Sequence, residues 1–245
     1  MLFVPLWDMN RLKSVDFQYV TVTLIVLNAV VFFAFQASFV FPGGEEFTSS
    51  FSVVPRDLFG DTAVPAIAGE AMTQPEAQTS VLPERLTLIT YMFLHGNILH
   101  LGSNMLFLFI FGDNVEDAMG HIRFLLFYLF CGIFAGLAHV VMTNSPDAQL
   151  VGASGAIAGV IGAYVMLHPN IRVWVLIPKI PFIPLRFSAG FVIGFWVVLQ
   201  FVSVVLDPNA TTAWWAHIGG LIAGLILVLF MRRPGVPLFD KATGV

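Results

Sequence analysis

The chain has 245 residues, of which 58% are hydrophobic and only 11% are charged. Because soluble domains carry roughly 25% charged residues, this composition excludes an ordinary soluble protein and indicates an integral membrane protein. The net charge of −4 and the lack of a basic patch argue against a nucleic-acid partner. The single cysteine excludes an intrachain disulfide and a cysteine-based metal cluster.

Six apolar segments reach or approach the length of about 20 residues that a membrane helix needs. In chain order they are 19–41, 98–115, 121–143, 151–167, 187–206 and 214–231. The first is too long for a removable signal peptide and is interpreted as a signal anchor. The pattern predicts an all-α membrane protein whose six-helix transmembrane bundle covers 19–231. A segment at 1–18 precedes the bundle, a long loop interrupts it at about 42–97, and a tail follows at 232–245.

The basic residues predict how the six spans are oriented. If the chain starts on the inner side, nine of the eleven Lys and Arg residues lie inside and only Arg56 and Arg85 lie outside. We therefore expect cytoplasmic N- and C-termini, an external acidic loop at 42–97, and a multi-pass protein of the cell membrane, with the bacterial inner membrane as its location. The nine inner residues are Arg11, Lys13, Arg123, Arg172, Lys179, Arg186, Arg232, Arg233 and Lys241.

Four polar residues share one predicted depth in the membrane. His100 and Asn104 lie early in the second segment, Ser154 early in the fourth and His217 early in the sixth. These three segments run in the same direction, from outside to inside. Polar groups are costly at membrane depth and indicate function there, so their common depth predicts a shared site.

Small residues predict that the fourth and sixth segments pack closely. Gly155, Gly159 and Gly162 follow Ser154 at helical spacing, while Gly220 and Gly224 follow His217. Such faces let two backbones approach each other in lipid. A close contact between the two segments brings the Ser154 hydroxyl within reach of the His217 ring.

A serine beside a histidine is suited to acyl transfer. Histidine activates the hydroxyl as a nucleophile by accepting its proton. The reaction also needs donors for the developing oxyanion, and His100, Asn104 and the backbone N–H of Ser154 at the start of its helix are candidates. Gly152 and Gly155 leave room for a substrate strand. Since the sequence places no Asp or Glu at the same predicted membrane depth, a Ser/His dyad is expected rather than a triad.

In this order, the motifs resemble those of the rhomboid family of intramembrane serine proteases. They are His95, His100-Leu-Gly-Ser-Asn104-Met, Gly152-Ala-Ser-Gly155 and Ala216-His217-Ile-Gly-Gly220-Leu-Ile-Ala-Gly224. The resemblance implies Ser154 as nucleophile, His217 as base and acid, and His100, Asn104 and the Ser154 amide around the oxyanion. It also implies cleavage of transmembrane protein substrates in or near the outer part of the bilayer, without metal or cofactor.

The chain departs from the family pattern in two places. The stretch Leu82–Arg85 lacks the tryptophan of a Trp-Arg pair found in many members, and Ala158 stands where some members carry an aromatic residue that stacks on the histidine. We therefore expect another group to orient His217, with Trp214 or Trp215 as candidates.

The polar residues also have simpler interpretations. Ser154 alone is typical of helix packing, and the histidines are typical of a membrane interface. A rhomboid-like pseudoprotease that binds or escorts membrane clients is the main alternative function. A transporter or a metal enzyme is disfavoured because the sequence lacks a His-Glu-x-x-His motif and repeated halves. The acidic residues Asp113, Glu116 and Asp117 are expected to form a solvated turn, and the sequence does not predict an oligomeric state.

Overall fold

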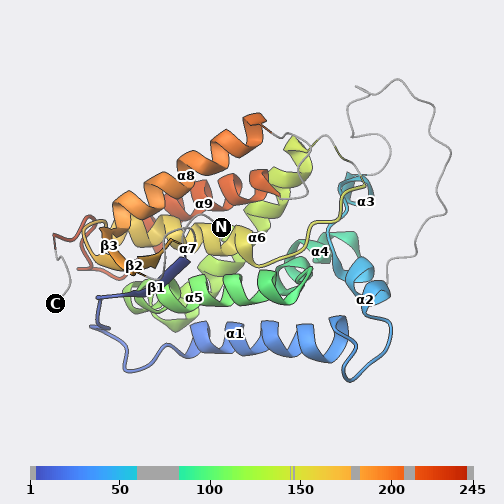
Figure 1. Ribbon diagram of the computed structural model, residues 1–245, viewed down its shortest axis with the longest axis horizontal. Helices are drawn as coiled ribbons and strands as arrows, with labels where there is room; N and C mark the ends of the chain where they lie inside the picture. The colour runs from blue at the N-terminus through green and yellow to red at the C-terminus, as the bar shows by residue number, and fades with distance from the viewer. Residues whose placement is uncertain are drawn as a thin grey trace.

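The computed structural model describes residues 4–59, 83–143, 145, 147–177, 183–206 and 213–241. The described chain is mostly helical, and its long helices lie side by side (Figure 1). The helices are α1 (Tyr19–Val31), α2 (Gly44–Phe51), α3 (Pro55–Phe59), α4 (Glu84–Thr90), α5 (Ile98–Met119), α6 (His121–Met142), α7 (Ser154–Leu167), α8 (Ala189–Leu206) and α9 (Trp214–Met231). A π-helical turn at Phe32–Gln36 extends α1, and a short 3-10 turn at Tyr91–Phe93 follows α4.

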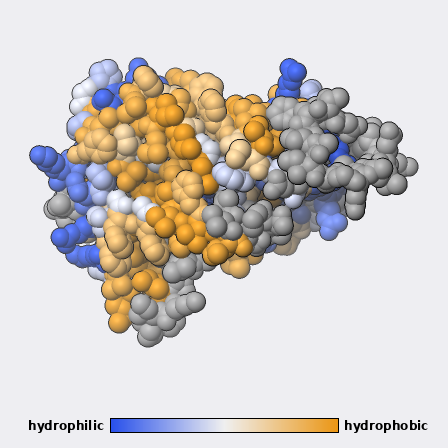
Figure 2. Space-filling model, turned by 90° about the horizontal axis from the view of Figure 1, so that it is seen from above, coloured by the Kyte–Doolittle hydropathy of each residue, from blue (hydrophilic) through white to orange (hydrophobic). Residues whose placement is uncertain are grey.

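Each of the six predicted apolar segments contains a helix. Among the described residues, four helices are long and apolar enough to cross a membrane: Tyr19–Gln36, α5, α6 and α9. The apolar stretches Ser154–Leu167 of α7 and Ala189–Ser203 of α8 are shorter. Apolar side chains cover the middle of the face seen in Figure 2, while hydrophilic residues gather at its left end. The exposed apolar surface is what a helical membrane protein presents to lipid.

The predicted boundaries of the apolar segments differ from those of the helices. The first helix with its π-turn ends at 36 rather than 41, α5 continues to 119 rather than 115, and α7 begins at 154 rather than 151. The predicted long loop contains the short helices α2, α3 and α4, and its residues 60–82 lie outside the described part of the chain.

A small antiparallel sheet corrects the all-α prediction. It has the order β1-β2-β3, where β1 is Val4–Asp8, β2 is Arg172–Leu176 and β3 is Leu185–Ser188. The central strand alternates, because Val173 and Val175 are buried while their neighbours are more exposed. The sheet lies at the end of the molecule where α7 and α9 finish, called the sheet end below (Figure 1). The opposite end, where α5, α7 and α9 begin, is called the Ser154 end.

Helices α6, α7 and α9 form the most closely packed part of the molecule. A Cβ atom on Gly220 would collide with the carbonyl of Gly155, and one on Gly224 would collide with the carbonyl of Gly159. The backbones of α7 and α9 therefore touch directly, as the small-residue faces predict. This contact fixes the distance between the first turns of the two helices.

Two acidic residues near the end of α5 hold the N-terminal segment. Glu116 is fully buried, and its carboxylate accepts hydrogen bonds from the backbone N–H groups of Val20 and Thr21 at the start of α1. Asp117 accepts hydrogen bonds from the N–H groups of residues 13–15. The expected solvated turn is wrong for both residues, because each carboxylate satisfies backbone donors that would otherwise be unpaired.

A third acidic residue joins the sheet to the helices. Asp8, the last residue of β1, accepts hydrogen bonds from the hydroxyl of Tyr164 on α7 and from Asn114 Nδ2 on α5, the latter at 3.2 Å. Burial raises the pKa of the Asp8 carboxyl to about 6. Strand β1 is therefore attached to the same helix that begins with Ser154.

The glycine contact generates a first prediction. Gly224→Ala places a methyl group against the backbone of Gly159, so α7 and α9 must separate. Overpacking of this kind costs about 1–3 kcal/mol, and we expect a lower unfolding temperature in detergent, measured by circular dichroism. Gly194→Ala on α8 is the matched control, because a Cβ there meets nothing within 4 Å. Equal unfolding temperatures for the two variants would contradict the assignment of this contact.

The Asp8 carboxyl generates a prediction about pH. Its pKa is about 6 in the folded protein and 3.8 in the reference state, so the folded state binds the proton more tightly between these values. Stability therefore falls as pH rises from about 4 to about 6, by an amount on the order of 2 kcal/mol. Asp8→Asn should flatten that part of the profile, measured as unfolding temperature against pH. An unchanged slope in the variant would show that Asp8 is not its source.

Candidate active site

Ser154 and His217 lie in direct contact. Ser154 is the first residue of α7, His217 lies in the first turn of α9, and His217 Nε2 is 2.8 Å from Ser154 Oγ. Both residues are partly exposed at the Ser154 end of the helices. The contact follows from the glycine packing described above, because α7 and α9 run in the same direction with their backbones touching.

The second predicted pair lies against the loop that leads into α7. Gly152 has a φ of +124°, and a Cβ there would lie 2.8 Å from His100 Cε1 and 3.7 Å from Asn104 Nδ2. Only glycine adopts this backbone conformation readily and leaves the space for the imidazole ring. The structure thus brings Ser154, His217, His100 and Asn104 into one region, as their common predicted depth requires.

Several donors in this region are available to an oxyanion. The Ser154 N–H is at the first position of α7 and has no preceding turn to bind. Asn104 Nδ2 is buried and, within the described residues, has no hydrogen-bond partner. The Gly96 N–H donates to His100 Nδ1 at 3.4 Å, so His100 carries its own proton on Nε2, the nitrogen nearer to Gly152.

His217 is oriented by a residue that the sequence did not predict. Gln200 on α8 places its Oε1 2.8 Å from His217 Nδ1. Trp214, one of the two tryptophans expected near the ring, lies edge-on with its centroid 5.9 Å away, and Trp196 on α8 lies at the same distance with a tilt of 36°. The signal for Gln200 was an isolated amide in an otherwise apolar segment, where a polar side chain needs a partner.

The predicted glycines divide between two roles. Gly152 faces His100, and its predicted role of leaving room for a substrate strand stays a prediction. The missing side chain of Gly155 points toward Ala135 on α6 and the start of α9, so its predicted part in substrate approach is replaced by helix packing. Gly159, Gly220 and Gly224 also lie in the contact between helices.

His95 precedes α5 and packs beside His100 in its first turn. The two rings are 5.2 Å apart in an edge-to-face arrangement, and neither ring nitrogen of His95 has a partner within the described residues. Burial lowers the pKa of the His95 ring to about 3, which keeps it neutral. The backbone of His95 is held by Gln36, which binds both its N–H and its carbonyl.

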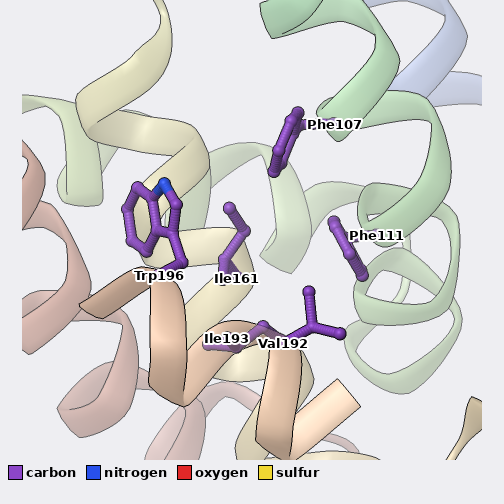
Figure 3. Close-up of a pocket in the computed structure, with 6 residues that line it drawn as sticks. All are labelled: Phe107, Phe111, Ile161, Val192, Ile193 and Trp196. Carbon is purple, nitrogen blue, oxygen red and sulfur yellow. The ribbon is translucent and has the colours of Figure 1, made fainter. Parts of the chain in front are cut away.

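A small apolar pocket lies between α5, α7 and α8. Figure 3 shows side chains from α5, α7 and α8 that converge on it, without a charged group among them. Trp196 lines this pocket and also lies beside the His217 ring. The lining residues of the pocket are Phe107, Phe111, Ile161, Val192, Ile193 and Trp196.

These features define a helical, multi-pass membrane protein with a serine–histidine pair at the start of two packed helices. Residues 83–234 match the Rhomboid domain, which is more than half of the chain. The chain therefore belongs to the rhomboid family, a family of intramembrane proteases, as its motifs indicate.

Similar proteins occur in plants and bacteria. The chain is 32% identical over 151 residues to RHOMBOID-like protein 5 of Arabidopsis thaliana, covering 61% of this chain and 45% of that protein. It is 32% identical over 154 residues to Rhomboid protease GluP of Bacillus subtilis, covering 63% of this chain and 27% of that protein. The putative rhomboid protease YdcA of the same bacterium is 40% identical over 80 residues, 33% of this chain and 40% of that protein. The chain thus spans less than half the length of these relatives.

The position of Gly152 generates a prediction. Gly152→Ala forces a Cβ into a left-handed conformation and against the His100 ring. We expect a roughly hundredfold or greater slowing of the reaction of Ser154 with a fluorophosphonate, because displacing His100 as an oxyanion donor would cost about 2.7–4 kcal/mol. Gly102→Ala on α5 is the control, since a Cβ there meets nothing within 4 Å. If the Gly152→Ala variant were labelled at the wild-type rate, Gly152 would not be part of the site.

Proposed function

We propose that the protein is an intramembrane serine endopeptidase that uses a Ser154/His217 dyad. The observation that carries this proposal is the 2.8 Å contact between His217 Nε2 and Ser154 Oγ within the apolar helices of a rhomboid-family chain. A serine hydroxyl needs a base to become a nucleophile, and a neutral imidazole with a free Nε2 lone pair supplies one.

The reaction proceeds in two halves. Ser154 Oγ attacks the carbonyl carbon of the scissile peptide bond while His217 Nε2 takes the hydroxyl proton. The tetrahedral intermediate collapses, the C–N bond breaks, and His217 gives the proton to the leaving amine, which leaves an acyl ester on Ser154. Water then attacks the ester with His217 again as base, and the proton returns to Ser154 Oγ as the acid product departs.

Three donors support the negative charge that develops in both halves. They are the Ser154 N–H, the Nε2–H of His100 and the Nδ2–H of Asn104. The unpartnered, buried state of Asn104 Nδ2 supports this role, because an unpaired buried amide is costly unless it serves a ligand. The N-terminal end of α7 adds a favourable dipole.

The surroundings of the dyad favour transmembrane segments as substrates. The pocket between α5 and α8 is lined only by apolar side chains, and Trp196 joins it to the surroundings of His217, so the side of the dyad that faces these helices suits a lipid-embedded segment. A helical segment must unwind to be cut, because its peptide carbonyls are engaged in its own hydrogen bonds. Segments weakened by glycine or proline are therefore the expected substrates.

The distribution of basic residues supports an orientation for the site. Arg172 and Arg186 lie in the sheet, and Arg233 lies beside the α5–α6 turn at the same end. We place the sheet end and both termini in the cytoplasm by the positive-inside rule, which puts Ser154 toward the outer face of a six-span protein. Cleavage is then expected in the outer part of the bilayer.

The test compares nucleophile variants in one assay. Ser154→Ala and His217→Gln should each lower fluorophosphonate labelling and cleavage of a transmembrane reporter in liposomes by at least about 10³-fold, as in other serine hydrolases. Ser50→Ala is the control, because the Ser50 hydroxyl is exposed and binds only the Glu46 carbonyl among the described residues.

The outcomes separate the two functions. Labelling of Ser154→Ala at the wild-type rate would overturn the dyad. A wild-type protein that binds the reporter but neither cleaves it nor reacts with the fluorophosphonate would instead be a client-binding pseudoprotease.

A further inference from the structure

We propose that Gln200 is a positioning residue that extends the dyad to a Ser154–His217–Gln200 triad, in which a neutral amide orients the histidine. This inference rests on the proposed protease function and assigns the group that orients its base. Gln200 is 4% exposed, and its Oε1 lies 2.8 Å from His217 Nδ1. The two ring nitrogens of His217 thus contact Gln200 on one side and Ser154 on the other, each at 2.8 Å.

The amide oxygen selects the tautomer of His217. An amide oxygen can only accept a hydrogen bond, so the ring proton resides on Nδ1 and the lone pair of Nε2 faces Ser154 Oγ. The opposite orientation of the amide would donate to Nδ1 and move the proton to Nε2. That tautomer cannot take the serine proton. The orientation of the Gln200 amide therefore determines whether His217 can act as the base.

A neutral partner suits the position of the site. A carboxylate at this depth would carry a large desolvation cost, whereas an amide with its oxygen paired does not. This explains how the base is held although Asp and Glu are absent from the early parts of the segments that contain Ser154 and His217. The amide fixes the ring but stabilises the imidazolium less than a carboxylate does.

Helix α8 orients the ring through two side chains on one face. Trp196 lies four residues before Gln200, so both project from the same side of α8 toward His217. Trp196 and Trp214 lie beside the ring, each with its centroid 5.9 Å away, and Gln200 fixes the rotation of the ring.

The experiment uses three variants of the full chain in detergent. Gln200→Leu keeps the approximate shape and removes the acceptor, Gln200→Glu keeps an acceptor oxygen, and Val198→Leu changes a 57% exposed residue on the same helix as a control. The readouts are the rate of fluorophosphonate labelling, kcat and KM for a transmembrane reporter, and the ¹⁵N NMR signals of selectively labelled histidine.

We expect Gln200→Leu to lower the labelling rate and kcat by about tenfold to a hundredfold with little change in KM, because the lost hydrogen bond orients the base and not the substrate. Gln200→Glu should lose less of the rate than Gln200→Leu, because it keeps an acceptor oxygen although its carboxylate is costly to desolvate. Val198→Leu should behave as wild type. The His217 signals should show the proton on Nδ1 in wild type and a mixture of tautomers in Gln200→Leu.

Three results would overturn the proposal. They are wild-type labelling by Gln200→Leu, equal losses in Gln200→Leu and Gln200→Glu, and a wild-type His217 with its proton on Nε2. The NMR reading of the wild-type protein needs no variant to fold and no activity to be present. An inactive wild type with the proton on Nδ1 would therefore refute the protease function while leaving the Gln200–His217 contact established.

Discussion

The direct backbone contact between α7 and α9 is the constraint on which the site depends. Gly220 and Gly224 on α9 meet the backbone of α7, where a side chain on either residue would collide with the carbonyl of Gly155 or Gly159. Parallel helices held this closely place their first turns side by side, and Ser154 and His217 occupy those turns. A wider helix separation would carry the hydroxyl and the ring out of hydrogen-bond range, whatever their chemistry.

Polar groups in this apolar molecule are matched to one another locally. Glu116 and Asp117 satisfy the free N–H groups before and at the start of α1, and Asp8 binds Tyr164 and Asn114 at the sheet end. Around the site this matching is incomplete within the described residues, because Asn104 Nδ2, both ring nitrogens of His95 and Trp214 Nε1 are buried without a partner. A buried donor without a partner is expensive in a stable fold and valuable beside a developing charge.

The sequence predicted the parts of this arrangement that follow from local pattern. Helical spacing identified the small faces of α7 and α9, and the common direction of three segments placed His100 near Ser154. The sheet was missed because β1 and β2 are separated by more than 150 residues and neither strand shows its pairing alone. Glu116 and Asp117 were expected in solvent because nothing local reveals that a distant backbone will cover them. Gln200 was missed because its partner is 17 residues away on another helix.

The length of α7 bears on the depth at which Ser154 would lie in a bilayer. Its 14 residues span about 21 Å, whereas the hydrocarbon core of a bilayer is about 30 Å thick. Its far end is attached to the sheet through Tyr164 and Asp8. With the sheet end at one boundary of the bilayer, as we propose, α7 would stop roughly 9 Å short of the other boundary, and the entry loop at Gly152 would descend into the membrane to reach Ser154. The rate of the proposed reaction would then depend on bilayer thickness, because a thicker membrane would lengthen the path of the hydrolytic water to Ser154.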